Sequence, residues 1–265
     1  MGILNVTPDS FSDGGSFFDP EEAGRRAMEM QRQGADIIDI GGESSRPGAE
    51  RIPVRVELDR VLPVIEELAG RLSVPLSIDT HRPAVASAAL DAGCRMVNDV
   101  TACGHPEMPD LIREYDVPVV IMHMKGEPGS MQSAPSYDDV VGEVSAYLAE
   151  KIMFLNDRGI ARERIIVDPG IGFGKRFRDN LVLLGAAARA YDLGCPILIG
   201  ASRKRFLGEL LDAPAKDRLG GSLAVAARCY QMGVDMVRVH DVKETVGLFR
   251  VLDAMDCPDE YQADW

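Results

Sequence analysis

Short apolar stretches recur along the whole chain, and most are rich in isoleucine and valine. Their hydrophobic residues run almost continuously instead of alternating with polar ones. This pattern is typical of strands that are buried on both faces of a parallel sheet. The stretches predict strands at residues 2–6, 36–40, 74–79, 95–100, 117–123, 164–169, 195–200 and 235–240.

Longer segments with the apolar spacing of helices lie between these runs. They cover residues 20–34, 54–72, 83–93, 138–159, 180–193, 221–233 and 242–255. Several begin with proline, aspartate or asparagine and end at glycine, as helix capping predicts. Eight strand-helix units in about 250 residues match a (β/α)₈ barrel, whereas a doubly wound sheet usually has fewer strands or a second domain. No linker interrupts the chain, so we expect an α/β TIM barrel that forms a single domain over residues 1–265.

The composition narrows the choice of partners. The chain has 265 residues and a formal net charge of −13, which opposes binding to nucleic acid or to anionic membranes, so an anionic ligand needs a local basic cluster. No apolar run approaches the roughly 18 residues of a membrane span, and no secretory signal is recognisable, so we expect a cytoplasmic protein. The cysteines are odd in number and widely spaced, which predicts small buried side chains instead of disulfides or a zinc site.

Polar residues gather where the predicted strands end. In a (β/α)₈ barrel the segments after the carboxyl ends of the strands form the active site, so these residues are expected on one face of the protein. The alternative for any single segment is a solvated turn, which favours the same residue types. The residues are Asn5, Glu43 to Arg46, Asp79, Asn98, Asp99, His123, Asp168, Ser202 to Lys204, Arg238, His240 and Asp241.

The acidic and amide members of this set stand inside or at the tip of strongly apolar runs. Asp79, Asn98 and Asp168 are therefore costly to bury unless each finds a hydrogen-bond partner. A flat heterocycle with paired N–H groups would be such a partner, because a carboxylate accepts two parallel hydrogen bonds from that edge. The alternatives are internal capping of loops or pairing with a buried lysine.

The basic members form a second chemical group. Arg238 and His240 alternate along the last strand and so project to one face, and together with Arg46 they would clamp a phosphate or diphosphate. The alternative is a salt-bridged strand end. Lys204 follows the seventh strand at the start of a helix, where basic residues oppose the helix dipole and a ligand would explain them. Three roles are open for Lys204: a Schiff-base nucleophile, a hydrogen-bond donor to a ligand, or a surface lysine.

The motif DPGIGFGK, residues 168–175, looks at first like a nucleotide-binding loop. It fails as a P-loop, because proline stands at the position of the first glycine and Arg176 follows the lysine where serine or threonine is needed. Its glycines instead predict a tight turn above the barrel that exposes Phe173 for stacking.

Taken together, the motifs resemble the dihydropteroate synthase family over nearly the whole chain. The blocks that carry the resemblance are GILNVTPDSFSDGG, GGESSRPGA, SIDT, VNDV, MHMKGEPGSMQ, DPGIGFGK, GASRKRFLG and RVHDV, in this order. The resemblance implies a (β/α)₈ transferase of folate biosynthesis that joins 6-hydroxymethyl-7,8-dihydropterin diphosphate to p-aminobenzoate and releases diphosphate. It also implies a Mg²⁺ cofactor, sulfonamides as inhibitors and a homodimer.

The same resemblance assigns residues to each ligand. The pterin would be held by Asp79, Asn98, Asp168 and Lys204, and the diphosphate by Asn5, Arg238 and His240, with Asn5 also near the Mg²⁺ ion. The p-aminobenzoate would contact Ser45, Pro47, Phe173 and Ser202 under the first two strand-helix loops, which include Thr7, Asp9, Phe11 and Arg46. The residues expected to act in catalysis are Asp79, Lys204, Arg238 and His240. Because this chemistry needs no covalent enzyme intermediate, it argues against a Schiff base at Lys204.

Two rival functions use the same pterin pocket. A pterin-binding methyltransferase domain would transfer a methyl group to a corrinoid protein and would have no use for a diphosphate clamp. A catalytically silent pterin-binding subunit would bind the pterin without turnover. The basic residues at the strand ends count against the first, and the complete set of Asn5, Lys204 and His240 counts against the second.

Overall fold

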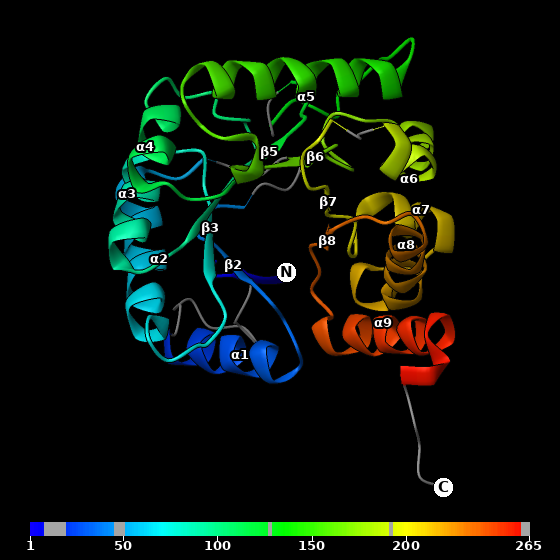
Figure 1. Cartoon of the computed structure of the whole chain (residues 1–265), viewed down its shortest axis with the longest axis horizontal. Helices are drawn as coiled ribbons and strands as arrows, with labels where there is room; N and C mark the ends of the chain where they lie inside the picture. Colours follow the sequence, from blue (N-terminus) through cyan, green and yellow to red (C-terminus); the bar gives the residue numbers. More distant parts are fainter. Residues whose placement is uncertain (8–19, 45–50, 127–128, 191–192, 261–265) are drawn as a thin grey trace, which may run out of the picture.

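The structure is a computed structural model, and it describes residues 1–7, 20–44, 51–126, 129–190 and 193–260. The strands form a ring in the middle of the molecule, surrounded by helices (Figure 1). In chain order they are β1 (Gly2–Asn5), β2 (Ile38–Gly41), β3 (Leu76–Asp79), β4 (Met96–Asp99), β5 (Val119–Met122), β6 (Ile165–Asp168), β7 (Leu198–Ile199) and β8 (Met236–Val237). Every predicted strand is present, each shorter than its apolar run.

The ring closes through parallel pairing. Strands β1 to β6 form one parallel sheet in sequence order, and β7 pairs with β8. Parallel bridges from Gly2 to Val239 and from Val167 to Ile197 join the two sheets at both edges. The chain is therefore a (β/α)₈ barrel, as the sequence predicted.

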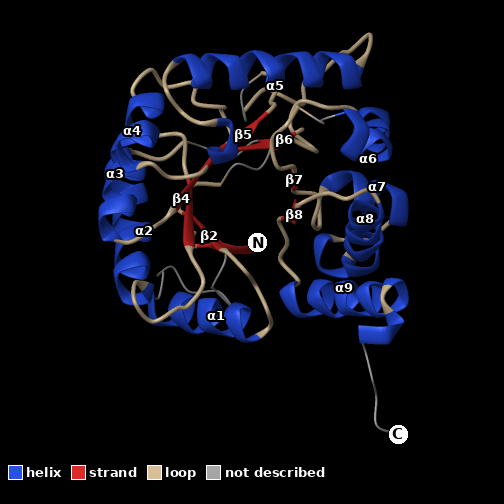
Figure 2. Cartoon of the chain, in the orientation of Figure 1, coloured by secondary structure: helices blue, strands red, loops and turns tan. Residues whose placement is uncertain are grey.

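The helices cover the outside of the ring (Figure 2). They are α1 (Pro20–Arg32), α2 (Val54–Leu68), α3 (Pro83–Ala92), α4 (Met108–Tyr115), α5 (Val140–Asp157), α6 (Phe177–Ala190), α7 (Arg205–Leu211), α8 (Leu219–Gln231) and α9 (Val242–Asp256). Local signals set several ends: α3 begins at Pro83 and ends before Gly93, whose φ is +127°, and Asp139 caps α5 by accepting from Gly142 N at 3.1 Å. Among the described residues, no helix is long and apolar enough to cross a membrane.

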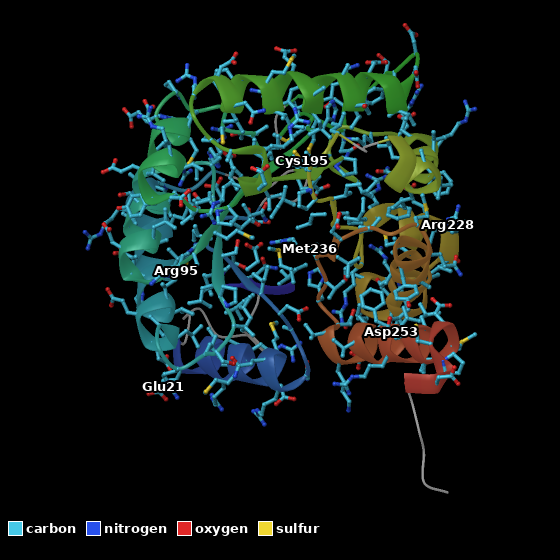
Figure 3. All side chains as sticks on the ribbon, in the orientation of Figure 1. Glu21, Arg95, Cys195, Arg228, Met236 and Asp253 are labelled. Carbon is cyan, nitrogen blue, oxygen red and sulfur yellow. The ribbon has the colours of Figure 1, made fainter. Side chains whose placement is uncertain are left out.

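Strand parity separates the inside of the barrel from its outer core. Met96 and Ile166 belong to a small cluster inside the ring, whereas Val97 and Val167 belong to the large core under the helices. Met236, which contacts the inner cluster, lies toward the centre in Figure 3, while Arg228 lies at the outer side. A residue two positions after an inward one shares its face. An apolar plug therefore lies beneath inward-facing polar residues at the carboxyl ends of the strands.

Candidate active site

The predicted acidic and basic residues meet at the carboxyl-terminal mouth of the barrel. A Cβ added to Gly200 would lie 3.7 Å from Asp168 Oδ2, 3.9 Å from Arg238 Cβ and 4.0 Å from Lys204 Nζ. The mouth thus brings together side chains from the ends of β6 and β8 and from the segment after β7. The absence of a side chain on Gly200 leaves space between them.

A second part of the mouth carries the amide of Asn5 from β1 and the carboxylate of Asp79 from β3. A Cβ added to Gly41 would lie 3.6 Å from both Asn5 Oδ1 and Asp79 Oδ2. Arg238 connects this side to the first one, because its Nη2 donates to Asp79 Oδ2 at 2.7 Å. The expectation that the acids and the cations share one face is confirmed for these residues.

Arg238 is the centre of a buried network. Besides its bond to Asp79, its Nε donates to Asp39 Oδ2 at 2.6 Å, and the same oxygen accepts from Asn98 Nδ2 at 3.0 Å. The salt-bridged strand end, which the sequence left open for Arg238, therefore describes its contacts in the structure. Each carboxylate accepts only one N–H group of the guanidinium, so its further N–H groups can still serve an anion.

Burial strongly affects the Asp79 carboxylate of this network. Burial raises the pKa of Asp79 to about 7; Arg238 opposes this shift, and the neighbouring charge of Asp39 adds to it. Asp39 is fully buried, and its Oδ1 has no hydrogen-bond partner among the described residues. A ligand that brings N–H donors to Asp79 would stabilise its ionised form.

Asp168 and Lys204 form the other half of the pocket. Asp168 Oδ1 accepts from Gly170 N at 2.7 Å, which is the internal loop capping considered from the sequence. Burial raises the pKa of Asp168, while Lys204 lowers it. Burial lowers the pKa of Lys204 to about 8, and its Nζ donates to Ile171 O and lies 4.4 Å from the ring centroid of Phe173. Lys204 is therefore turned into the site as a donor and is not a surface lysine.

The segments after β7 and β8 are fastened to each other. Ser202 Oγ accepts from His240 N at 3.2 Å and lies 3.0 Å from His240 Nδ1. Arg203 has a left-handed backbone with φ of +57° and forms an ion pair with Asp241. The expectation that a ligand accounts for the basic residues before α7 is therefore wrong for Arg203, whose charge is matched by Asp241.

Several predicted residues cannot be placed. Ser45, Arg46 and Pro47 lie outside the described residues, as do Asp9 and Phe11. The described part of the chain contains no group of three or more His, Cys, Asp or Glu side chains that could hold a metal ion. The amide oxygen of Asn5, beside the carboxylate of Asp79, is a donor type that Mg²⁺ accepts.

Sequence reasoning missed Asp39. The residue lies inside the apolar run DIIDI and is as buried as the acids that were selected. The signal that identified Asp79, a charge within a buried strand, applies equally to Asp39. Asp39 stands inside its run, as Asn98 does, so the same signal could have identified it.

The comparisons with known proteins agree with this geometry. Residues 1–240 match the family model described as pterin binding enzyme. The dihydropteroate synthase of Escherichia coli (strain K12) is 46% identical over 254 residues, which are 96% of this chain and 90% of that protein. The rival methyltransferase and silent-subunit functions are not those of this relative.

Solved structures of dihydropteroate synthases are also similar to this chain. Dihydropteroate synthase of Yersinia pestis, in a sulfonamide complex, superposes with a TM-score of 0.92 at 42% identity, covering 96% of this chain and 93% of that one. The Xanthomonas albilineans enzyme in complex with 7,8-dihydropteroate has a TM-score of 0.87 at 44% identity, covering 96% and 92%. The chain therefore belongs to the pterin-binding enzymes and, within them, to the dihydropteroate synthase family.

Proposed function

We propose that this protein condenses 6-hydroxymethyl-7,8-dihydropterin diphosphate with p-aminobenzoate and releases 7,8-dihydropteroate and diphosphate for folate biosynthesis. It is a transferase, as are its relatives. The observation that carries the proposal is the joint position of Asp168, Lys204 and Arg238 around Gly200, with Arg238 linking them to Asp79 beside Asn5.

The pterin ring is recognised by the buried acids and their neighbours. Its paired N–H edge meets a carboxylate of Asp79 or Asp168, and Asn98 supplies a further polar group. Lys204 donates a hydrogen bond to a ring acceptor. Because burial disfavours the charged forms of Asp79 and Asp168, hydrogen bonds from the pterin N–H groups would stabilise these carboxylates.

The diphosphate lies against Asn5, Arg238 and His240. In the reaction the bond between the pterin methylene carbon and the diphosphate oxygen breaks, and its electron pair leaves with the diphosphate. The amine of p-aminobenzoate then attacks the methylene carbon, and the proton it loses passes to solvent. The buried carboxylates stabilise the positive charge on the ring, while Arg238 and His240 stabilise the departing anion.

Mg²⁺ fits this arrangement as a shared ion. Mg²⁺ is usually held by one or two protein groups together with substrate phosphates, and Asn5 Oδ1 supplies one oxygen at the edge of the pocket. A bound Mg²⁺ ion would neutralise charge on the diphosphate. Phe173 and Ser202, together with Ser45 and Pro47, are assigned to p-aminobenzoate.

The assembly and the location of the protein are part of the proposal. Large apolar side chains are exposed on helices that lie on one side of the barrel in Figure 1, which favours a homodimer through this face. They are Phe177, Leu181 and Val182 on α6, Leu210 and Leu211 on α7, and Val251 and Met255 on α9. The enzyme is assigned to the cytoplasm.

A diphosphate-release assay tests the reaction. Release that requires p-aminobenzoate and Mg²⁺, together with 7,8-dihydropteroate identified by mass spectrometry, is the expected result. Calorimetric binding of the pterin diphosphate without any turnover would contradict the proposal and would favour a silent binding protein.

A further inference from the structure

The motif DPGIGFGK ends in a lysine that the proposed reaction does not use. Lys175 is buried, with 2% of its surface exposed. Its ammonium donates to His123 O at 3.2 Å and to Phe173 O at 3.0 Å, and it lies 3.0 Å from His123 Nδ1. The side chain therefore joins the end of β5 to the segment after β6, with its head group turned into the protein.

Four successive carbonyl groups of the segment after β6 accept hydrogen bonds from side chains. The pairs are Ile171 with Lys204, Gly172 with Gln132 at 2.6 Å, Phe173 with Lys175 at 3.0 Å, and Gly174 with Tyr137 at 2.7 Å. Each donor fixes the orientation of one peptide plane, because turning that plane would leave its carbonyl group unpaired. These four side chains thus hold the segment in one backbone conformation.

The segments after β5 and β6 also touch through their backbones. A Cβ added to Gly170 would lie 1.9 Å from His123 O, and a Cβ added to Gly174 would lie 2.1 Å from Lys125 O. Both glycines have positive φ, of +70° and +61°. Only glycine permits this approach. Lys175 spans this contact and binds a carbonyl on each side of it.

The charge states of the pair suit this contact. Burial, together with the charge of Lys175, lowers the pKa of His123 to about 3, so the imidazole is neutral and its Nδ1 can accept from the ammonium. Burial lowers the pKa of Lys175 to about 7, and Asp168 opposes that shift. The edge of the His123 ring meets the Tyr147 ring at a centroid distance of 5.0 Å, which fixes its plane.

We propose that Lys175 is a positioning residue that fixes the place of the Phe173 ring on the p-aminobenzoate side of the site. The inference rests on the proposed function, which assigns Phe173 to that substrate. Lys175 holds the Phe173 carbonyl, and the Phe173 ring lies against the ammonium of Lys204. Loss of Lys175 moves this aromatic wall and leaves Asp79 and Asn98 in place, since both lie on other strands.

Lys175→Met, which keeps the length and apolar stem of the side chain, tests the proposal. We expect the KM for p-aminobenzoate to rise about tenfold and the calorimetric Kd of the pterin to rise by a smaller factor, because the charge of Lys175 also lowers the pKa of Asp168. Lys175→Arg should restore most of the loss, because its guanidinium can donate to both carbonyls. Lys243→Met removes an exposed lysine of α9 and serves as the control.

Amide hydrogen exchange of residues 170–174 gives a readout that does not need turnover. Lys175→Met should exchange at least tenfold faster there than the parent, and unchanged exchange or an unchanged KM for p-aminobenzoate would overturn the proposal. An equal loss of pterin affinity would also overturn it. If Lys175→Met does not fold, Tyr137→Phe and Gln132→Met remove neighbouring donors, and each should raise that KM two- to threefold. A parent without turnover would refute the proposed function, while the exchange result would still decide this inference.

Discussion

Replacement of Arg238 by methionine removes the cation that Asp39 and Asp79 share. In the parent the guanidinium donates to Asp39 and Asp79, whose side chains are 0% and 12% exposed. Removing one partner of a buried ion pair costs about 3–5 kcal/mol, because the remaining charge is left desolvated. For a chain of this size that corresponds to a loss of roughly 10 °C in Tm.

The loss should depend on pH in a definite direction. The folded pKa of Asp79 is about 7, above the value near 3.9 of an unfolded chain. Between those values the folded state binds more protons than the unfolded one, so this group destabilises the fold as pH rises. Without Arg238 the pKa of Asp79 rises further, and the penalty continues to grow above pH 7. We expect the loss of unfolding free energy in Arg238→Met to be about 1–2 kcal/mol larger at pH 8 than at pH 5.5.

Urea denaturation of the parent and of Arg238→Met at the two pH values measures this difference. Arg228→Met is the matched control, because Arg228 is exposed on α8. A loss of unfolding free energy equal to that of Arg228→Met would refute the reasoning about the buried network. So would a loss that is larger at pH 5.5 than at pH 8.

Other substitutions probe the pocket and the loops that support it. Asp168→Asn should weaken pterin binding about 10- to 100-fold in calorimetry while the circular dichroism spectrum stays unchanged, and equal affinity would count against the acid pocket. Arg82→Met should lower the free energy of unfolding by about 3–5 kcal/mol, because Arg82 bridges two carboxylates at 2.6 Å each, one of them 1% exposed. Arg71→Met, which removes the exposed ion pair with Glu67, should lower the free energy of unfolding by less than about 1 kcal/mol. Similar losses for Arg82→Met and Arg71→Met would contradict the distinction between buried and exposed ion pairs. Gly174→Ala should cost more than about 2 kcal/mol through its clash and positive φ, whereas Gly185→Ala, with open space around it, should stabilise α6 by about 0.5–1 kcal/mol.

The fold was predictable because apolar runs and segments with helical spacing alternate along the whole chain. Most strands are apolar runs buried on both faces, and the alternation that places Met96 inside and Val97 outside requires only the period of a strand. Strand ends were less predictable: β8 stops at Val237, although the apolar run continues to His240. Its closing contact to β1 is a bridge at Val239, which depends on the curvature of the whole ring.

The site was predictable where burial makes a polar residue costly. Asp79, Asn98 and Asp168 were identified on that ground, and the structure brings each to the mouth. The partner of Arg238 could not be read from the sequence, because a long side chain at a strand end reaches either an acid or a phosphate with equal ease. Lys175 was equally ambiguous, since only the fold shows that its ammonium faces His123.

The central claim is that one mouth holds the ring by its acids and the departing diphosphate by its cations. A crystal structure of the protein with the pterin diphosphate and Mg²⁺ tests this most directly. We predict that the N–H edge of the ring contacts Asp79 or Asp168 and that diphosphate oxygens lie within hydrogen-bond distance of Arg238 and His240. A diphosphate bound away from both cations, or a ring bound outside the acid pocket, would contradict the account.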